Sequence, residues 1–199
     1  MGVTGRVLGI DPGNVVTGFG VIEGGASHPA HVAAGVIRPP AGLRGGERLK
    51  IIHERLLAII DQFAPAAMSL ECSFVAANVQ SALRLGEARA VAMLAAATRG
   101  LALFEYTPNE VKLTVAGHGH AEKAQVKYMV RRTLGVDETV ALADDASDAL
   151  AIALCHLFSA RMSAAAAAGG GCAFDGRKPR PGRAAAARAS NGRARVGAK

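Results

Sequence analysis

The chain has 199 residues, a length typical of one domain, and half of them are apolar, which is enough for a sizeable core. Its net charge of +7 comes from the C-terminal end: residues 161–199 carry nine Lys or Arg and one acid, whereas residues 1–160 carry 14 basic and 15 acidic residues. Three cysteines with no CxxC spacing argue against a disulfide framework or a zinc site. There is no signal-peptide pattern and no apolar run of ~20 residues, so we expect a cytosolic protein with no membrane span.

The first part of the chain is typical of a meander of strands. Residues 5–10, 16–23 and 31–38 are short apolar runs separated by turn residues. The short turn between the first two runs predicts an antiparallel pair. Pro39-Pro40 and the glycines up to Gly46 then mark a loop.

Helices alternate with short strands in the rest of the chain. Apolar residues at helical spacing predict a helix from residue 47 to about residue 63, which Pro65 ends. The later predicted elements are a strand at 68–71, an Ala-rich helix at 79–99, a strand at 101–106, and helices at 109–116, 121–134 and 144–160. This order predicts an α/β fold with a mixed five-stranded sheet flanked by helices.

Composition divides the chain into two parts. Residues 1–160 form the predicted folded domain, and residues 161–199 form an Ala/Gly/Arg-rich basic tail that we expect to be disordered. Such a tail is either a contact for a polyanion or a solubilising extension with no partner, and its composition is equally compatible with both.

Acidic side chains occur where two buried strands end and where a buried helix begins. Asp11 closes the run "GID" and Glu71 closes the run "SLE". Ligand sites in open α/β sheets lie beyond such strand ends, so we expect these two acids to be neighbours. Asp145 and Asp148 are three residues apart at a helix start and therefore share a face, with Asp144 placed as an N-cap.

Each acid has an ordinary interpretation by itself, for example Asp11 as a turn residue and Asp148 as compensation of a helix dipole. Together, several carboxylates repel one another, and a hard dication relieves that repulsion. All-oxygen ligands suit Mg²⁺, for which Mn²⁺ can substitute. Two such ions roughly 4 Å apart can clamp the attacking and leaving oxygens of a phosphoryl displacement. The pattern predicts a metal-dependent phosphodiesterase whose catalytic and metal-binding residues are Asp11, Glu71, Asp145 and Asp148.

Four segments resemble RuvC, the family of bacterial Holliday junction resolvases. They are GIDPGNVVTGFGVI, ECSFVAANVQSALRLGEARA, FEYTPNEVKLTVAGHGHAEKAQV and DDASDALAIALCHL, in the family's order over about residues 6–158. The resemblance implies a ribonuclease-H-like fold, a homodimer and Mg²⁺-dependent cutting of four-way DNA junctions in recombination and repair. It implies paired symmetric nicks with 5′-phosphate and 3′-hydroxyl ends, and RuvA and RuvB as branch-migration partners.

The resemblance also implies roles for single residues. The four acids fall at the positions of the family's catalytic acids. Phe74 falls at an aromatic thought to stack on an opened base, a contact worth about 1–3 kcal/mol. Lys112 and Lys123 fall at functional lysines that can reach phosphates, and either can stabilise the charged transition state; we assign Lys123 to the catalytic residues and Lys112 to the DNA contacts. Ala77 departs from the family, whose members often carry lysine there.

Further basic residues are open to two interpretations. Lys127 and Arg131 continue the basic helix, either as DNA contacts or as a solvated face. Arg84 and Arg89, on the long Ala-rich helix, are similarly ambiguous. The small side chains of that helix suit either a dimer face or packing against the sheet.

Three other functions compete with the resolvase hypothesis. An actin-like ATPase or sugar kinase shares the first motif, but it needs a second glycine-rich phosphate loop that this sequence lacks. A non-catalytic DNA-binding protein that uses the tail does not need four converging acids. A ribonuclease-H-like nuclease acting on other nucleic acids remains open, because substrate preference cannot be read from composition.

Overall fold

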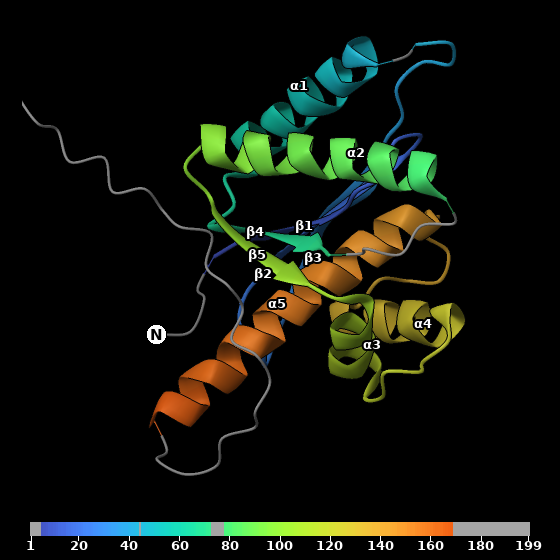
Figure 1. The fold of residues 1–199 in the computed structure, drawn as a ribbon. Helices are drawn as coiled ribbons and strands as arrows, with labels where there is room; N and C mark the ends of the chain where they lie inside the picture. The colour runs from blue at the N-terminus through green and yellow to red at the C-terminus, as the bar shows by residue number, and fades with distance from the viewer. Residues whose placement is uncertain (1–4, 44, 73–77, 169–199) are drawn as a thin grey trace, which may run out of the picture.

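The computed structural model describes residues 5–43, 45–72 and 78–168. Five strands form one mixed sheet in the order β3-β2-β1-β4-β5 (Figure 1). The strands are β1 (Val7–Asp11), β2 (Thr17–Glu23), β3 (Ala30–Ile37), β4 (Ala67–Glu71) and β5 (Ala102–Tyr106). β1, β2 and β3 are antiparallel neighbours, whereas β4 runs parallel to β1 and β5 runs parallel to β4. The predicted five-stranded mixed sheet is therefore confirmed.

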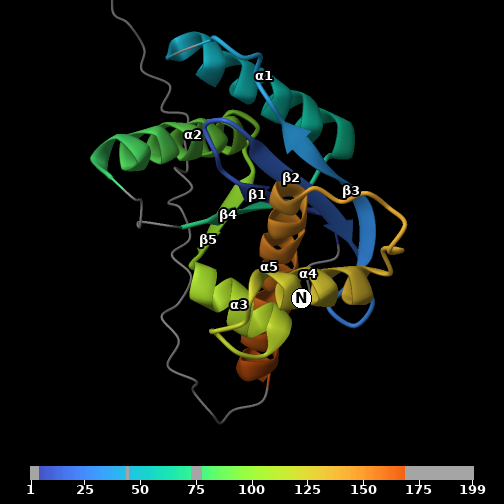
Figure 2. The ribbon, with the colours of Figure 1, turned by 90° about the vertical axis from the view of Figure 1, so that its right-hand side faces the viewer.

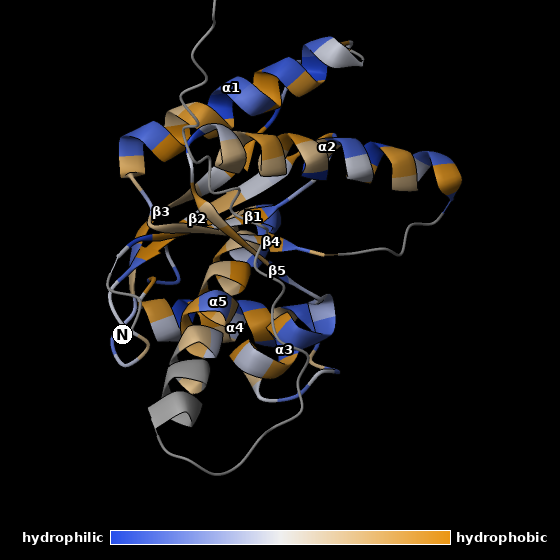
Figure 3. Cartoon of the chain, turned by 60° about the vertical axis from the view of Figure 1, so that its left-hand side comes forward, coloured by the Kyte–Doolittle hydropathy of each residue, from blue (hydrophilic) through white to orange (hydrophobic). Residues whose placement is uncertain are grey.

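Helices cover both faces of this sheet (Figures 1 and 2). On one face lie α1 (Gly46–Phe63) and α2 (Val79–Thr98), and on the other lie α3 (Pro108–Ala116), α4 (Lys123–Leu134) and α5 (Asp144–Ala168). Apolar residues gather between these layers, and the outer turns of α1 and α4 carry more hydrophilic residues (Figure 3). The result is a three-layer α/β arrangement.

Strand alternation creates two separate cores. Val7 belongs to the cluster that packs under α5, while Leu8 and Ile10 belong to the cluster that packs under α1 and α2. This division follows from the period of two in a strand, which sends neighbouring side chains to opposite faces. On the α2 side, small residues fill the gap: Ala88, Ala92, Ala95 and Ala96 are buried. Of the two interpretations of this Ala-rich helix, packing against the sheet is thus confirmed.

Glycines on β1 and β2 let α5 lie directly on the sheet. A Cβ on Gly9 would lie 2.0 Å from the carbonyl oxygen of Ala149, and one on Gly18 would lie 2.0 Å from that of Asp145. No side chain other than hydrogen fits between these backbones. The close approach sets the depth at which α5 begins and so places its acids beside the end of β1.

The last helix differs from its prediction at both ends. It continues past the predicted end at residue 160 to Ala168, because the alanines that follow are strong helix formers. Asp144, predicted as an N-cap, is instead the first residue of the helix, and its carboxylate accepts a hydrogen bond of 2.6 Å from Lys127 Nζ. Residues 169–199, most of the predicted tail, lie outside the described residues. In the described ranges, no helix is both long enough and apolar enough to cross a bilayer.

His156 is a histidine buried on α5, away from the acids. Its Nδ1 lies 2.8 Å from the Tyr106 hydroxyl, and its ring packs on Phe104 with 4.2 Å between the ring centroids. Burial lowers the pKa of His156 from 6.5 to about 4. The folded state therefore holds this imidazole neutral at a pH where the unfolded chain protonates it.

We expect His156 to make the fold sensitive to acid. Because its folded pKa lies below its unfolded pKa, the stabilisation is complete above pH 6.5 and is lost as the pH falls toward 4. Between pH 7 and pH 5 the free energy of unfolding should fall by about 2 kcal/mol from this group. Urea unfolding at both pH values, in wild type and in His156→Gln, isolates the effect. Equal pH dependence in the two proteins would contradict it.

Candidate active site

Two of the predicted acids lie at the ends of adjacent parallel strands. Asp11 ends β1 and Glu71 ends β4, and the pairing of these strands runs from Val7 with Ala67 to Ile10 with Leu70. The next residue on each strand is therefore an acid at the same edge of the sheet. The predicted proximity of Asp11 and Glu71 is confirmed, and parallel pairing is its cause.

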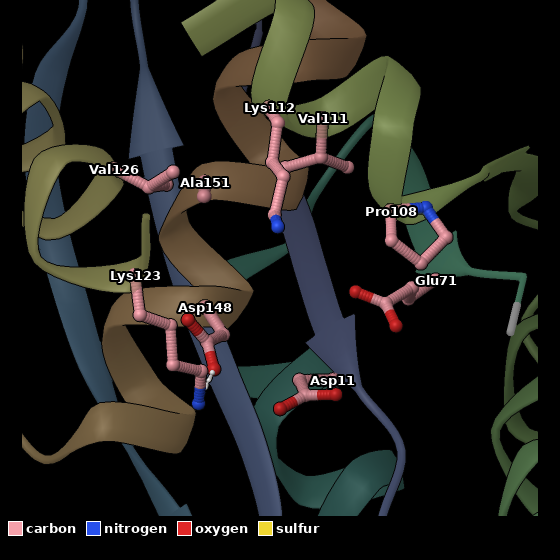
Figure 4. Close-up of a pocket in the computed structure, with 9 residues that line it drawn as sticks. All are labelled: Asp11, Glu71, Pro108, Val111, Lys112, Lys123, Val126, Asp148 and Ala151. Atoms are coloured by element: carbon pink, nitrogen blue, oxygen red, sulfur yellow. Dashed lines mark ion pairs between the residues drawn. The ribbon is translucent and has the colours of Figure 1, made fainter. Parts of the chain in front are cut away.

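A cavity of about 350 Å³ opens at this edge of the sheet. Figure 4 shows the carboxylates of Asp11, Glu71 and Asp148 around it, with Lys112 reaching in from α3 and Lys123 from α4. The apolar part of its wall was not predicted as part of the site and consists of Pro108, Val111, Val126 and Ala151. No sequence signal assigns these four to a site, since Pro108 begins α3 as an ordinary helix-start residue and the other three are apolar residues within helices.

The first two turns of α5 contribute the other acids. Asp148 lines the cavity, while Asp145 lies outside its lining but close enough to Asp11 to raise the pKa of that carboxyl. Their spacing of three residues places them on one side of the helix, as predicted. The structure thus brings three predicted acids to one cavity and the fourth to its border.

The electrostatics of the cavity reflect crowded negative charge. Burial, followed by repulsion from Glu71, Asp148 and Asp145, raises the pKa of Asp11 to about 7, and Lys123 opposes this. Burial and Asp148 likewise raise the pKa of Glu71, against the influence of Lys123 and Lys112. Burial and neighbouring carboxylates thus disfavour the ionised forms of Asp11 and Glu71, which is typical of a site that binds a cation.

Lys123 is the cation in closest contact with these acids. Its Nζ lies 2.8 Å from Asp148 Oδ2, and this ion pair, together with Asp11 and Asp144, raises the pKa of the lysine. The Lys123 side chain is 72% exposed, whereas that of Asp148 is 27% exposed. The ammonium is therefore charged and stands at the mouth of the cavity, where it can also meet an incoming anion.

The remaining predicted DNA contacts have different surroundings. Lys127 is paired with Asp144, beside the cavity. Arg131 donates to the carbonyl oxygens of Asp137 and Val140, at 2.6 and 2.8 Å, so it holds the loop that leads into α5. Phe74 and Ala77 lie outside the described residues.

The donor set fits a hard cation in its chemistry, because the acids offer oxygen ligands only. Within the described ranges, however, no three His, Cys, Asp or Glu side chains are already arranged to hold one ion. Asp148 instead has Lys123 as its partner. Repulsion among the acids is the observation that favours a cation here, and binding would require the carboxylates to draw closer.

Comparison with known proteins identifies the family of this chain. Residues 7–156 match the family model described as crossover junction endodeoxyribonuclease RuvC. The chain belongs to the RuvC family. The match spans every strand, α1 to α4, and the start of α5 with its acids. The predicted class of enzyme, a crossover junction endodeoxyribonuclease, is that of the family.

Individual RuvC proteins are similar over nearly their whole length. RuvC of Alkalilimnicola ehrlichii is 50% identical over 159 residues, which cover 80% of this chain and 94% of that protein. RuvC of Thermotoga maritima is 42% identical over 156 residues, covering 78% and 92%. The structure of T. thermophilus RuvC in complex with a Holliday junction substrate superposes with a TM-score of 0.75 at 37% identity, covering 79% of this chain and 96% of that one. The predicted ribonuclease-H-like fold of RuvC is thereby confirmed.

Proposed function

We propose that this protein resolves Holliday junctions by metal-dependent hydrolysis of two opposing strands. The observation that carries the proposal is the cavity at the ends of β1 and β4. Three carboxylates, of Asp11, Glu71 and Asp148, line it together with two lysines, Lys112 and Lys123. The similar T. thermophilus protein was solved with a Holliday junction substrate, which supports the same substrate here. Paired nicks with 5′-phosphate and 3′-hydroxyl ends, serving recombination and repair, are part of this proposal.

We assign the metal ligands to Asp11, Glu71, Asp145 and Asp148. Mg²⁺ is the expected ion, two per site with Mn²⁺ as a substitute, because the donors are all carboxylates. When bound, the ions lower the pKa of water and act as Lewis acids toward the phosphate. The protein's part is to hold four acids on rigid strand and helix ends, so that the scissile phosphate meets a preorganised site.

The lysines bring the phosphate to these acids. Lys112 points into the cavity from α3, and Lys123 stands at its mouth (Figure 4). A phosphate that enters can exchange with Asp148 as the partner of Lys123, and this exchange frees the carboxylate for a cation. Lys123 then stabilises charge on the phosphorane-like transition state. Lys127 and Arg131 extend the basic surface of α4 along the DNA, and Phe74 supplies base stacking.

Replacing Lys123 by methionine should lower kcat for junction cutting by about 100-fold, because removing one electrostatic contact to the transition state typically costs on that order. Junction affinity should change severalfold at most, since many other phosphate contacts remain. Single-turnover cleavage and fluorescence anisotropy measure the two quantities. Lys50→Met is a matched control, because Lys50 is an exposed, ion-paired lysine on α1. A kcat equal to that of wild type would mean that Lys123 does not stabilise the transition state.

The proposal includes a homodimer, because two symmetric cuts need two sites related by a two-fold axis. The outer face of α2 supports it: Val79, Leu83, Met93 and Leu94 are exposed apolar residues there. Docking with RuvA and RuvB, and a cytoplasmic location with access to chromosomal DNA, belong to the same proposal.

The test compares a synthetic four-way junction with a linear duplex of the same sequence, each with Mg²⁺ and with EDTA. We expect symmetric nicks in the junction only, all of them lost on metal removal. Equal cutting of the duplex would instead favour a ribonuclease-H-like nuclease of broader substrate range. Binding without any cutting would favour a non-catalytic DNA-binding protein.

A further inference from the structure

Behind the carboxylate cavity, Arg89 of α2 reaches the ends of two strands. Its guanidinium forms an ion pair with the carboxylate of Glu105 on β5 and lies 3.6 Å from Sγ of Cys72, the residue that directly follows Glu71. The Arg89 side chain is largely buried, with 19% exposed. One side chain thus ties α2 to the ends of β4 and β5, next to an acid of the active site.

Glu71 has open space on the side from which Arg89 approaches. A second cavity, of about 110 Å³, is lined by Asp11, Pro12, Glu71, Leu85 and Arg89. Asp11 and Glu71 therefore lie between two cavities, the larger one toward α3 and α4 and the smaller one toward α2. A carboxylate with space on both sides needs a restraint to keep it turned toward one of them.

The backbone supplies only part of that restraint. Cys72 N–H donates to the carbonyl oxygen of Tyr106 at 2.8 Å, which holds the end of β4 against β5. Both strands end at this point, so side-chain contacts must fix the position of α2 relative to them. Arg89 is suited to this task, because its planar guanidinium is always charged and its Nη2 contacts both Glu105 and Cys72 from a largely buried position.

The contact of Arg89 with Glu105 indicates a positioning role. Arg89 forms an ion pair with Glu105, and Lys123 and Lys112 are cations that lower the pKa of Glu71. We propose that the Arg89–Glu105 pair is a positioning element of the active site, which fixes the end of β4 so that Glu71 faces the larger cavity. This inference rests on the proposed metal-dependent function and assigns a role to a residue outside its four acids.

Arg89→Gln should weaken Mn²⁺ binding and lower kcat for junction cutting, each about tenfold, as is typical when a partner behind a metal ligand is removed. Junction affinity in EDTA should stay within about twofold, since Arg89 lies behind the site and other residues contact the phosphates. Isothermal titration calorimetry with Mn²⁺ measures the first quantity without any reference to activity. Glu105→Gln should reproduce both losses, and the double variant should be no worse than the worse single variant, because the pair acts as a unit.

Arg99→Gln is the matched control, because Arg99 follows the same helix and forms a two-bonded pair with Asp61, at 2.6 and 2.8 Å, on the outer surface. It should leave Mn²⁺ affinity and kcat unchanged. Arg89→Lys keeps the positive charge but lacks the planar guanidinium, and it should recover part of both losses. This variant also covers the case in which the Gln variant fails to fold. Wild-type Mn²⁺ affinity and kcat in Arg89→Gln, or equal losses in Arg99→Gln, would overturn the inference. A wild-type protein that cuts no junction would overturn the proposed function, and the Mn²⁺ titrations would still decide the role of Arg89.

Discussion

Asp11→Asn should abolish junction cutting, with a loss of about 1,000-fold or more in the single-turnover rate, at the upper end of single electrostatic contributions to catalysis. Asn has nearly the same shape but lacks the negative charge that a cation needs. Asp11 is the acid most surrounded by the others, since Glu71, Asp148 and Asp145 all act on its pKa. Removing its charge therefore weakens the centre of the proposed metal site and leaves the fold intact.

Junction binding by Asp11→Asn should persist or increase, because the substitution removes a negative charge from a surface that meets phosphates. Anisotropy with a labelled junction in EDTA measures this. Removing a repelled carboxylate should also raise the thermal midpoint of the metal-free protein, while added Mg²⁺ should stabilise wild type more than the variant. Asp61→Asn is the control for a surface acid, since Asp61 pairs with Arg99 far from the cavity. Cutting by Asp11→Asn at the wild-type rate would contradict the assignment of the site.

Gly18→Ala should lower the free energy of unfolding by about 3 kcal/mol or more, the upper range for overpacking a core. The added Cβ would lie 2.0 Å from the carbonyl oxygen of Asp145, and both partners are backbone positions that cannot turn aside. The start of α5 must move off the sheet, so the residual folded protein should also lose activity as Asp145 and Asp148 leave Asp11. Urea unfolding of the full chain measures the first effect.

Gly86→Ala provides the opposite case. Gly86 lies inside α2, and a Cβ there meets nothing within 4 Å in the described structure. Replacing a helical glycine by alanine should raise the free energy of unfolding by up to about 1 kcal/mol. If both alanine variants had the same stability, close packing of α5 on β2 would not be the reason for glycine at position 18.

The sequence by itself determined the elements and their order, because these depend on local patterns. Period-two and helical spacing of apolar residues predicted each strand and helix close to its observed bounds, as with the helix expected from residue 47 and found at Gly46–Phe63. The two differences between prediction and structure, both in the last helix, also have local causes. Apolar spacing predicts that the last helix ends at residue 160, whereas an alanine run without such spacing extends α5 to Ala168. The sequence predicts Asp144 as an N-cap, whereas it is the first residue of α5 and pairs with Lys127.

The acids of the site were also predictable, since strand ends and a helix start are visible in the sequence. Tertiary structure alone decided how they meet. Parallel pairing of β1 with β4 brings Asp11 to Glu71, and glycines that admit the backbone of α5 bring Asp148 to both. It also decided the side-chain partners of the cations: Lys123 pairs with Asp148, Arg131 donates to the Asp137 carbonyl oxygen, and Arg89 pairs with Glu105. Long side chains choose partners by distances across the fold, and a linear pattern does not contain those distances.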